Sequence, residues 1–246
     1  MTRRLLDFLA MVGSRAYGRD LADAHALRPV DVVLVDAMIP AGARAGLRLG
    51  LPTAVLMHTF SSFFGSPIFE LAGRVRGFST RRAWADADVV LVATDADLDP
   101  GSQRPRPTFV WTGVAEAAPK ALPRASSNGN LPKVLVSLSS VHIPGQDGIL
   151  QRILDGLADL PLHVVVTTGP TIDPTGLRVP PNATVHRHVP HRDVMPECAL
   201  VVGHGGHSTT MRALMHGLPL LVLPADPRVD QPSVRSEEHT SELQSL

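Results

Sequence analysis

Histidine, glycine and hydroxyl residues gather in one stretch of the chain, residues 201–231, which reads VVGHGGHSTTMRALMHGLPLLVLPADPRVDQ. An apolar run ends near Gly203, two further glycines permit a sharp turn, and hydroxyl residues follow where an apolar helix begins. Such a turn aims backbone N–H groups, hydroxyls and the positive end of the helix dipole at one point, which favours a phosphate or diphosphate. In the simpler interpretation, Ser208 only caps the helix. The residues expected to hold the anion are His204, Gly205, Gly206, Ser208 and Thr209.

The segments that must position these residues alternate between apolar runs and helical patterns. Residues 1–30 carry a helical pattern, and the run VDVVLVDAM at 30–38 predicts a fully buried strand that ends at Asp36. Later apolar runs again alternate with helix-like segments up to residue 224. Strands separated by helices pair in parallel through right-handed crossovers, so the sequence predicts an α/β fold with doubly wound sheets.

A change of composition divides the chain. Residues 114–132, VAEAAPKALPRASSNGNLP, lose periodicity and are rich in proline, serine, asparagine and glycine, which is typical of a linker. We therefore expect one domain over 1–113 and another over 133–234. The last segment, 235–246, reads RSEEHTSELQSL and resembles the in-frame translation of a sequencing-library adapter. We exclude it from reasoning about the fold, although a serine-capped helix is the alternative.

Charge and cysteine content exclude several classes of function. The formal net charge is zero, which argues against nucleic acids and anionic membranes as partners. Cys198 is the only cysteine, so the chain has no disulfide framework, and a reducing cytoplasm is the expected compartment. No apolar run is long enough to span a bilayer. The opening residues look like a signal peptide, but Asp7 interrupts their apolar stretch.

The second part of the stretch 201–231, GLPLLVLPADPRVDQ, makes the functional interpretation of its first part more specific. Together they resemble the donor-binding signature of family 1 nucleotide-sugar glycosyltransferases, HGG-x-[GS]-T-x₃-AL-x₂-G-x-P-x₄-P…DQ. The segment VLVSLSS at 134–140 is similar to the first strand of that family's C-terminal domain, and RHVPHRDVMPECALVVGHGG is similar to its base-covering segment. The matched signature residues are His204, Gly205, Gly206, Thr209, Ala213, Leu214, Gly217, Pro219, Pro224, Asp230 and Gln231.

This resemblance to UDP-glycosyltransferase-like enzymes implies the GT-B fold, with two Rossmann-like domains. It implies inverting, metal-independent transfer of a sugar from a nucleotide diphosphate sugar to the hydroxyl of a small-molecule or lipid-like acceptor, with no cofactor. In the N-terminal domain, Asp36 matches the aspartate that orients the family's catalytic histidine. Asp230 and Gln231 would hold the sugar hydroxyls. The remaining residues implied at the donor are Ser140, His188 and His191.

Three departures from the family pattern affect this interpretation. Arg212 stands where many relatives carry an acid that grips the ribose, and Asp230 comes two residues later than in the commonest spacing. The strand and histidine turn that supply the family's base have no counterpart before Asp36. The resemblance therefore predicts a truncated N-terminal domain, an incomplete C-terminal domain and little or no sugar transfer by this fragment, because losing a positioned base costs about 10²–10⁴ in rate.

Three alternatives remain open at this stage. His186, His188, His191, His204 and His207 fall within 22 residues and could form a zinc site, although no acidic or thiol ligand completes a recognised set. A nucleotide-sugar epimerase of the same fold shares the phosphate-binding logic. A non-catalytic fragment that only binds nucleotide is the third alternative.

Overall fold

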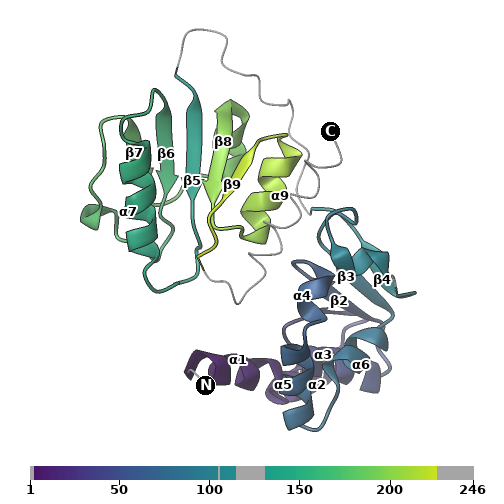
Figure 1. Cartoon of the computed structure of the whole chain (residues 1–246). Helices are drawn as coiled ribbons and strands as arrows, with labels where there is room; N and C mark the ends of the chain where they lie inside the picture. Colours follow the sequence, from purple (N-terminus) through teal and green to yellow (C-terminus); the bar gives the residue numbers. More distant parts are fainter. Residues whose placement is uncertain (1–2, 105, 115–130, 226–246) are drawn as a thin grey trace. The chain divides into compact units, whose positions relative to one another are not determined.

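The computed structural model describes residues 3–104, 106–114 and 131–225 (Figure 1). Its internal contacts divide the chain into two compact units, Met1–Ala115 and Glu116–Leu246, which we call unit 1 and unit 2. Most of the expected linker at 114–132 lies outside the described residues, as do Asp230, Gln231 and the whole segment 235–246.

Unit 1 holds a four-stranded parallel sheet in the order β1-β2-β3-β4. The strands are β1 Val33–Asp36, β2 Thr53–Met57, β3 Val89–Val92 and β4 Phe109–Trp111. The helices are α1 Arg3–Val12, α2 Ala16–Leu27, α3 Pro40–Arg48, α4 Ser61–Phe64, α5 Pro67–Val75, α6 Thr80–Ala85 and the short 3₁₀ helix η1 Pro100–Gln103. The helical pattern of residues 1–30 is thus two helices. At the break, a side chain at Gly13 would lie 2.6 Å from the Ala72 carbonyl oxygen of α5.

The first strand differs from its sequence-based prediction. Full burial was expected over 30–38, but β1 is shorter and alternates, with Val33 and Val35 buried and Leu34 62% exposed. Helices α3, α5 and α6 contribute to the core that contains Val33 and Val35. Because β1 is an edge strand and only one of its faces carries this core, every second residue faces away from it.

Unit 2 holds a five-stranded parallel sheet in the order β7-β6-β5-β8-β9 (Figure 1). Its strands are β5 Lys133–Ser137, β6 His163–Thr167, β7 Ala183–His186, β8 Cys198–Gly203 and β9 Leu220–Val222. Its helices are α7 Gln146–Leu157, α8 His191–Val194, α9 His207–Met215 and the 3₁₀ helices η2 Pro174–Gly176 and η3 Met195–Glu197. The predicted alternation of parallel strands and helices is confirmed in both units.

The sheet of unit 2 has a core on each face. Val134 and Val136 of β5 pack in the cluster that contains Leu150 of α7. Leu135, the residue between them, packs in the cluster that contains Ala213 of α9. Successive residues of a strand point to opposite faces, so this continuous apolar run is what a sheet covered on both sides requires. Within the described ranges, no helix combines the length and the hydropathy needed to cross a membrane.

A buried carboxylate ties together three segments of unit 1. Asp99, 1% exposed, accepts hydrogen bonds from the backbone N–H of Ser61 at 2.8 Å and of Gly101 at 3.0 Å. It also accepts one from the indole N–H of Trp111 at 2.8 Å. Burial raises the pKa of Asp99, but the hydrogen bonds from Ser61, Trp111 and Gly101 outweigh burial and hold the pKa below its ordinary value. Asp99 is therefore ionised, and in this form it holds α4, η1 and β4 together.

Replacing Asp99 by alanine removes the shared acceptor and leaves buried donors unsatisfied. We expect D99A to lower the free energy of unfolding by about 3 kcal/mol at neutral pH, measured by chemical denaturation. The exposed Asp97→Ala variant should change it by less than about 0.5 kcal/mol. Because the folded pKa of Asp99 is depressed, its contribution is complete near neutral pH and is lost as pH falls through the folded pKa. The gap between the two variants should shrink below about pH 4. A constant gap would contradict this account.

Candidate functional site

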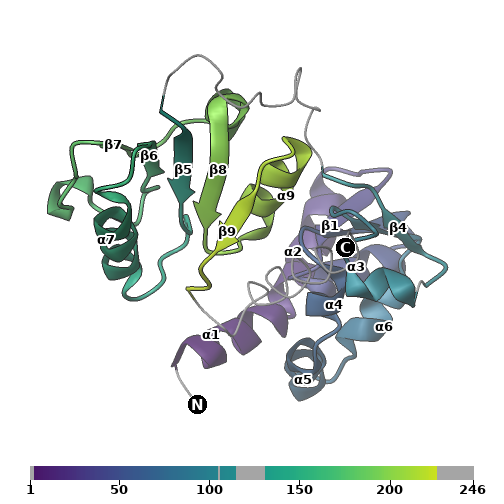
Figure 2. The same cartoon turned by 45° about the horizontal axis from the view of Figure 1, so that its top comes forward.

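The carboxyl ends of β5 and β8 lie next to each other in unit 2, where Ser137 pairs with Gly203 (Figure 2). The chain leaves β5 toward β6 and β7 on one side, and β8 then returns to the other side of β5. The strand order reverses at this point, and in open α/β sheets the crevice at such a reversal is where ligands bind. Ser139 and Ser140 follow β5, and His204 follows β8, so the sheet brings the two predicted segments to one edge.

Three glycines shape the turn after β8, each for its own reason. A Cβ at Gly203 would lie 3.3 Å from the Ser137 carbonyl oxygen of the neighbouring strand. Gly205 has φ of +82°, in the left-handed region that residues with a side chain rarely adopt. A Cβ at Gly206 would lie 2.6 Å from two atoms of the His204 ring, and His204 is buried, with only 7% of the residue exposed. A side chain is therefore crowded at Gly203, meets the His204 ring at Gly206, and strains the backbone at Gly205.

The positive end of α9 follows directly from this turn. The helix begins at His207, and Gly206 is its N-cap and makes no side-chain cap hydrogen bond. The N–H of Thr210 donates to the Gly206 carbonyl at 3.1 Å, so the N–H groups of residues 207–209 precede the first helical hydrogen bond. Ser208 is the second helical residue and not the cap, which contradicts the simpler interpretation of the sequence. The first turn contains no acidic residue, and its N–H groups are suited to an anion.

The other residues expected at the donor occupy the same strand ends. Ser140 is exposed in the loop after β5, and His188 is exposed between β7 and α8. His191 opens α8, and its Nε2 lies 3.3 Å from the Thr167 hydroxyl at the end of β6. Asp230 and Gln231 fall outside the described residues. The arrangement thus offers backbone N–H groups, hydroxyls and imidazoles at one edge of the sheet.

The rival chemistries are less well supported. Over the described ranges, no three histidine, cysteine, aspartate or glutamate side chains lie close enough to share a metal ion. The five histidines of 186–207 therefore do not form the zinc site considered from the sequence. Cys198 is buried at the start of β8, and desolvation raises the pKa of its thiol to about 11. The thiol stays protonated at neutral pH, and Cys198 packs in a core cluster of unit 2 instead of acting as a nucleophile.

Unit 1 contains a histidine–aspartate pair at the corresponding edge of its own sheet. Asp36 ends β1, His58 follows β2, and the two strands pair in parallel, which brings the residues together. His58 Nδ1 lies 3.0 Å from one Asp36 oxygen, and the Met38 N–H donates to the other at 2.7 Å. Burial raises the pKa of Asp36, but the hydrogen bonds from His58 and Met38 and the charge of His58 bring it below its ordinary value. Both side chains remain about half exposed, at 49% and 44%.

The sequence left Asp36 without a histidine partner and did not single out His58. The structure supplies that partner, since His58 pairs with Asp36. A usable signal was present in the sequence. Asp36 and His58 each stand at the end of consecutive apolar runs, and consecutive parallel strands place their carboxyl ends side by side.

Comparisons with known proteins show what this chain is similar to. Residues 151–241 match the family described as the C-terminal domain of erythromycin biosynthesis protein CIII-like proteins. A demethyllactenocin mycarosyltransferase of Streptomyces fradiae is 34% identical over 113 residues, which cover 43% of this chain and 24% of the relative. An L-demethylnoviosyl transferase of Streptomyces niveus is 26% identical over 216 residues, which cover 79% of this chain and 52% of the relative. The chain thus spans about half, or less, of these relatives.

Solved structures extend the likeness to both units. The glycotransferase of kitacinnamycin matches with a TM-score of 0.73 at 20% identity, over 98% of this chain and 69% of that one. The glycosyltransferase VinC, solved in complex with DTDP, matches with a TM-score of 0.66 at 18% identity, over 96% of this chain and 64% of that one. At this identity the likeness establishes the fold, and it confirms the predicted pair of Rossmann-like domains.

The contact between Gly206 and the His204 ring can be tested directly. Gly206→Ala forces the buried ring to move, and we expect a loss of about 1–3 kcal/mol in the free energy of unfolding. Gly156→Ala is the matched control, because a Cβ at this exposed helical position meets nothing within 4 Å. It should leave stability unchanged or raise it by up to about 1 kcal/mol. Equal effects of the two substitutions in chemical denaturation would show that the ring contact is unimportant.

Proposed function

We propose that this chain is part of a family 1 glycosyltransferase with the GT-B fold, and that its protein transfers a sugar from a nucleotide diphosphate sugar to a hydroxyl of a small-molecule acceptor. Unit 2 binds the donor, and unit 1 contributes the acceptor side. The observation that carries the proposal is the junction of β8 and α9, where the turn at 204–206 and the first N–H groups of α9 stand at the reversal of strand order.

On the donor side, the leaving group is a nucleoside diphosphate. As the bond between the anomeric carbon and the diphosphate oxygen breaks, negative charge grows on that oxygen. The N–H groups of residues 207–209 and the imidazole of His204 stabilise this charge, an electrostatic role worth about 10²–10³ in rate for each well-placed donor. We assign the sugar hydroxyls to Asp230 and Gln231 from the family signature, and the nucleoside to the neighbourhood of His188 and His191. These groups make a metal ion unnecessary.

On the acceptor side, the Asp36–His58 pair supplies a general base. Asp36 holds His58 through Nδ1, and this orients the ring and stabilises the imidazolium that forms when the base takes a proton. His58 removes the proton of the acceptor hydroxyl, the oxygen attacks the anomeric carbon, and the diphosphate leaves with the bonding electrons. Attack opposite to the leaving group inverts the anomeric carbon. His58 thus fills the role that the sequence left without a candidate.

The donor site is tested by nucleotide binding. Titration calorimetry of the 246-residue chain with TDP and UDP should give saturable binding of at least one of them. His204→Asn should weaken it by about tenfold, because one hydrogen bond to a charged group is lost. His163→Asn is the control, since His163 begins β6 at the opposite end of the sheet. Thermal denaturation establishes that both variants are folded. Unchanged nucleotide affinity in H204N would show that His204 does not contribute to the donor site.

The base is tested by transfer. We expect His58→Gln to lower kcat for transfer from TDP-glucose or UDP-glucose to 2-naphthol by about 100-fold or more, with nucleotide affinity unchanged. His25→Gln, on α2, is the control and should keep full activity. If H58Q is as active as the unaltered chain, the pair is structural. If the unaltered chain binds nucleotide but gives no turnover, the non-catalytic alternative replaces the proposal for this chain.

A further inference from the structure

A pocket of about 410 Å³ lies in unit 1 between α4, α6 and the segment that joins β3 to β4. Met57, Trp84 and Phe109 form apolar parts of its wall. The volume falls in the range of about 300–1,000 Å³ that is typical of small-molecule sites. Neither Asp36 nor His58 lines it, so the pocket is a separate feature from the pair described above.

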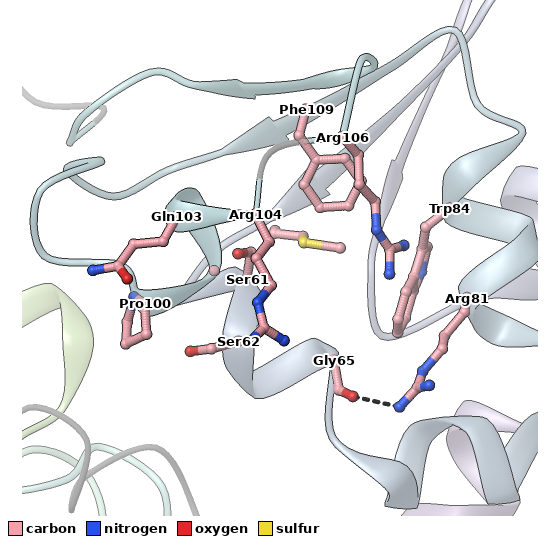
Figure 3. A pocket seen from close by; sticks show the side chains of 12 residues that line it. Ser61, Ser62, Gly65, Arg81, Trp84, Pro100, Gln103, Arg104, Arg106 and Phe109 are labelled. Atoms are coloured by element: carbon pink, nitrogen blue, oxygen red, sulfur yellow. Dashed lines mark hydrogen bonds between the residues drawn. The ribbon is translucent and has the colours of Figure 1, made fainter.

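Three arginines give the pocket a strongly positive rim. Arg104 and Arg106 extend into it from the segment after η1, and Arg81 reaches toward it from α6 (Figure 3). None of the described residues that line the pocket is acidic. Guanidinium groups are suited to carboxylate and phosphate because they present several N–H donors in a planar fork. The lining therefore selects for a ligand with an oxyanion.

Most of the donors of these arginines are available to a ligand. Arg81 uses one nitrogen to donate to the Gly65 carbonyl at 2.7 Å. The Arg106 guanidinium lies over the Phe109 ring, 5.4 Å from its centroid, which leaves its N–H edges unpaired by that contact. In the described part of the chain, Arg104 has no side-chain hydrogen bond or ion pair. Each guanidinium carries five N–H donors, so few of them are occupied.

Two carboxylates, Asp99 and Glu70, bond to residues of this pocket but do not line it. Asp99 accepts hydrogen bonds from the N–H groups of Ser61 and Gly101, two residues that line the pocket. Its oxygens are committed to these N–H groups and to the Trp111 indole. Glu70 accepts a hydrogen bond from the backbone N–H of Arg81 at 3.1 Å and forms an ion pair with Arg74 at 3.0 Å. Three guanidinium charges against these two carboxylates still leave a positive excess, although the chain as a whole has a formal net charge of zero.

Trp84 contributes a fixed apolar part of the pocket wall. The residue is 1% exposed, and its indole Nε1 is itself buried, so the indole N–H does not face the pocket as a donor for a ligand. Ring contacts of Trp84 with Phe64 and Phe69 hold the indole in place.

We propose that this pocket binds an aromatic molecule that carries an oxyanion, with its ring between Trp84 and Phe109 and its anion on Arg104 and Arg106. The inference rests on the proposed function in one respect only: under that function, the molecule bound in this pocket is the sugar acceptor. Free phosphate shares the oxyanion with an aromatic carboxylate but lacks the ring, and the test distinguishes the two.

The probe is 6-hydroxy-2-naphthoate, which has a fused ring, a carboxylate and a free hydroxyl. Its fluorescence is titrated with the intact 246-residue chain in the absence of nucleotide. We expect saturable binding below about 1 mM, and at least tenfold weaker binding of the neutral amide of the same ring, which lacks the charge. Inorganic phosphate at the same concentrations should not displace the naphthoate, because it offers no ring to Trp84 and Phe109.

Two variants locate the binding. Arg104→Gln should weaken naphthoate binding by about tenfold, and the double variant R104Q/R106Q should abolish it. Arg82→Gln is the matched control, because Arg82 is exposed on α6 next to Arg81 but does not line the pocket. It should bind naphthoate like the unaltered chain. Thermal denaturation establishes that all variants are folded. We expect this result because Arg82, Arg104 and Arg106 are exposed.

Several results overturn the proposal: no naphthoate binding by the unaltered chain, equal binding of the acid and its amide, equal losses in R104Q and R82Q, or displacement by phosphate. TDP and UDP titrations on the same samples keep this outcome apart from the proposed function. Nucleotide binding without naphthoate binding refutes only the proposal for the pocket. Naphthoate binding without nucleotide binding refutes only the proposed donor site.

Discussion

The parallel pairing of β5 with β8 is the constraint on which the candidate donor site depends. Parallel strands bring their carboxyl ends to the same edge, and here the register joins Ser137 to Gly203. That register would bring a Cβ at Gly203 to 3.3 Å from the Ser137 carbonyl oxygen, a tight contact, and it sets where the turn into α9 begins. If β8 paired one position further along, the turn would leave the sheet at a different height, and its N–H groups would no longer face the loop after β5. The chemistry of the turn therefore follows from the sheet.

Much of this site could be predicted from residue order alone, because it is local. The glycines, the hydroxyls and the helix start lie within seven residues, and their conformations depend mainly on one another. What the sequence did not disclose was long-range. Whether β1 is covered on one face or two depends on helices 10 to 50 residues away, and Leu34 looks the same in both cases. The pairing of Asp36 with His58 needed the strand order, since 22 residues separate them.

The same limit applies to the interior of unit 1. Nothing in the residues around Asp99 distinguishes it from the exposed acids at Asp95 and Asp97, which precede it in the same loop. Its role becomes visible only when β4 brings the Trp111 indole against it. The positive charge of the loop arginines Arg104 and Arg106 is likewise not apparent from the composition, because the formal net charge of the chain is zero. Average composition excludes partners that need a large charged face, but it does not detect a charge that is confined to one pocket.

The two glycines of the turn after β8 differ in how their loss could be repaired. At Gly205 the obstacle is the sign of φ, a property of the backbone that no neighbouring substitution alters. At Gly206 the obstacle is a side chain, the ring of His204, and a smaller residue at 204 would make room. Second-site suppressors of a change at Gly206 should therefore map to His204, whereas changes at Gly205 should have none nearby. In evolutionary terms, positions 204 and 206 can change together, while position 205 can change only if the whole turn is rebuilt.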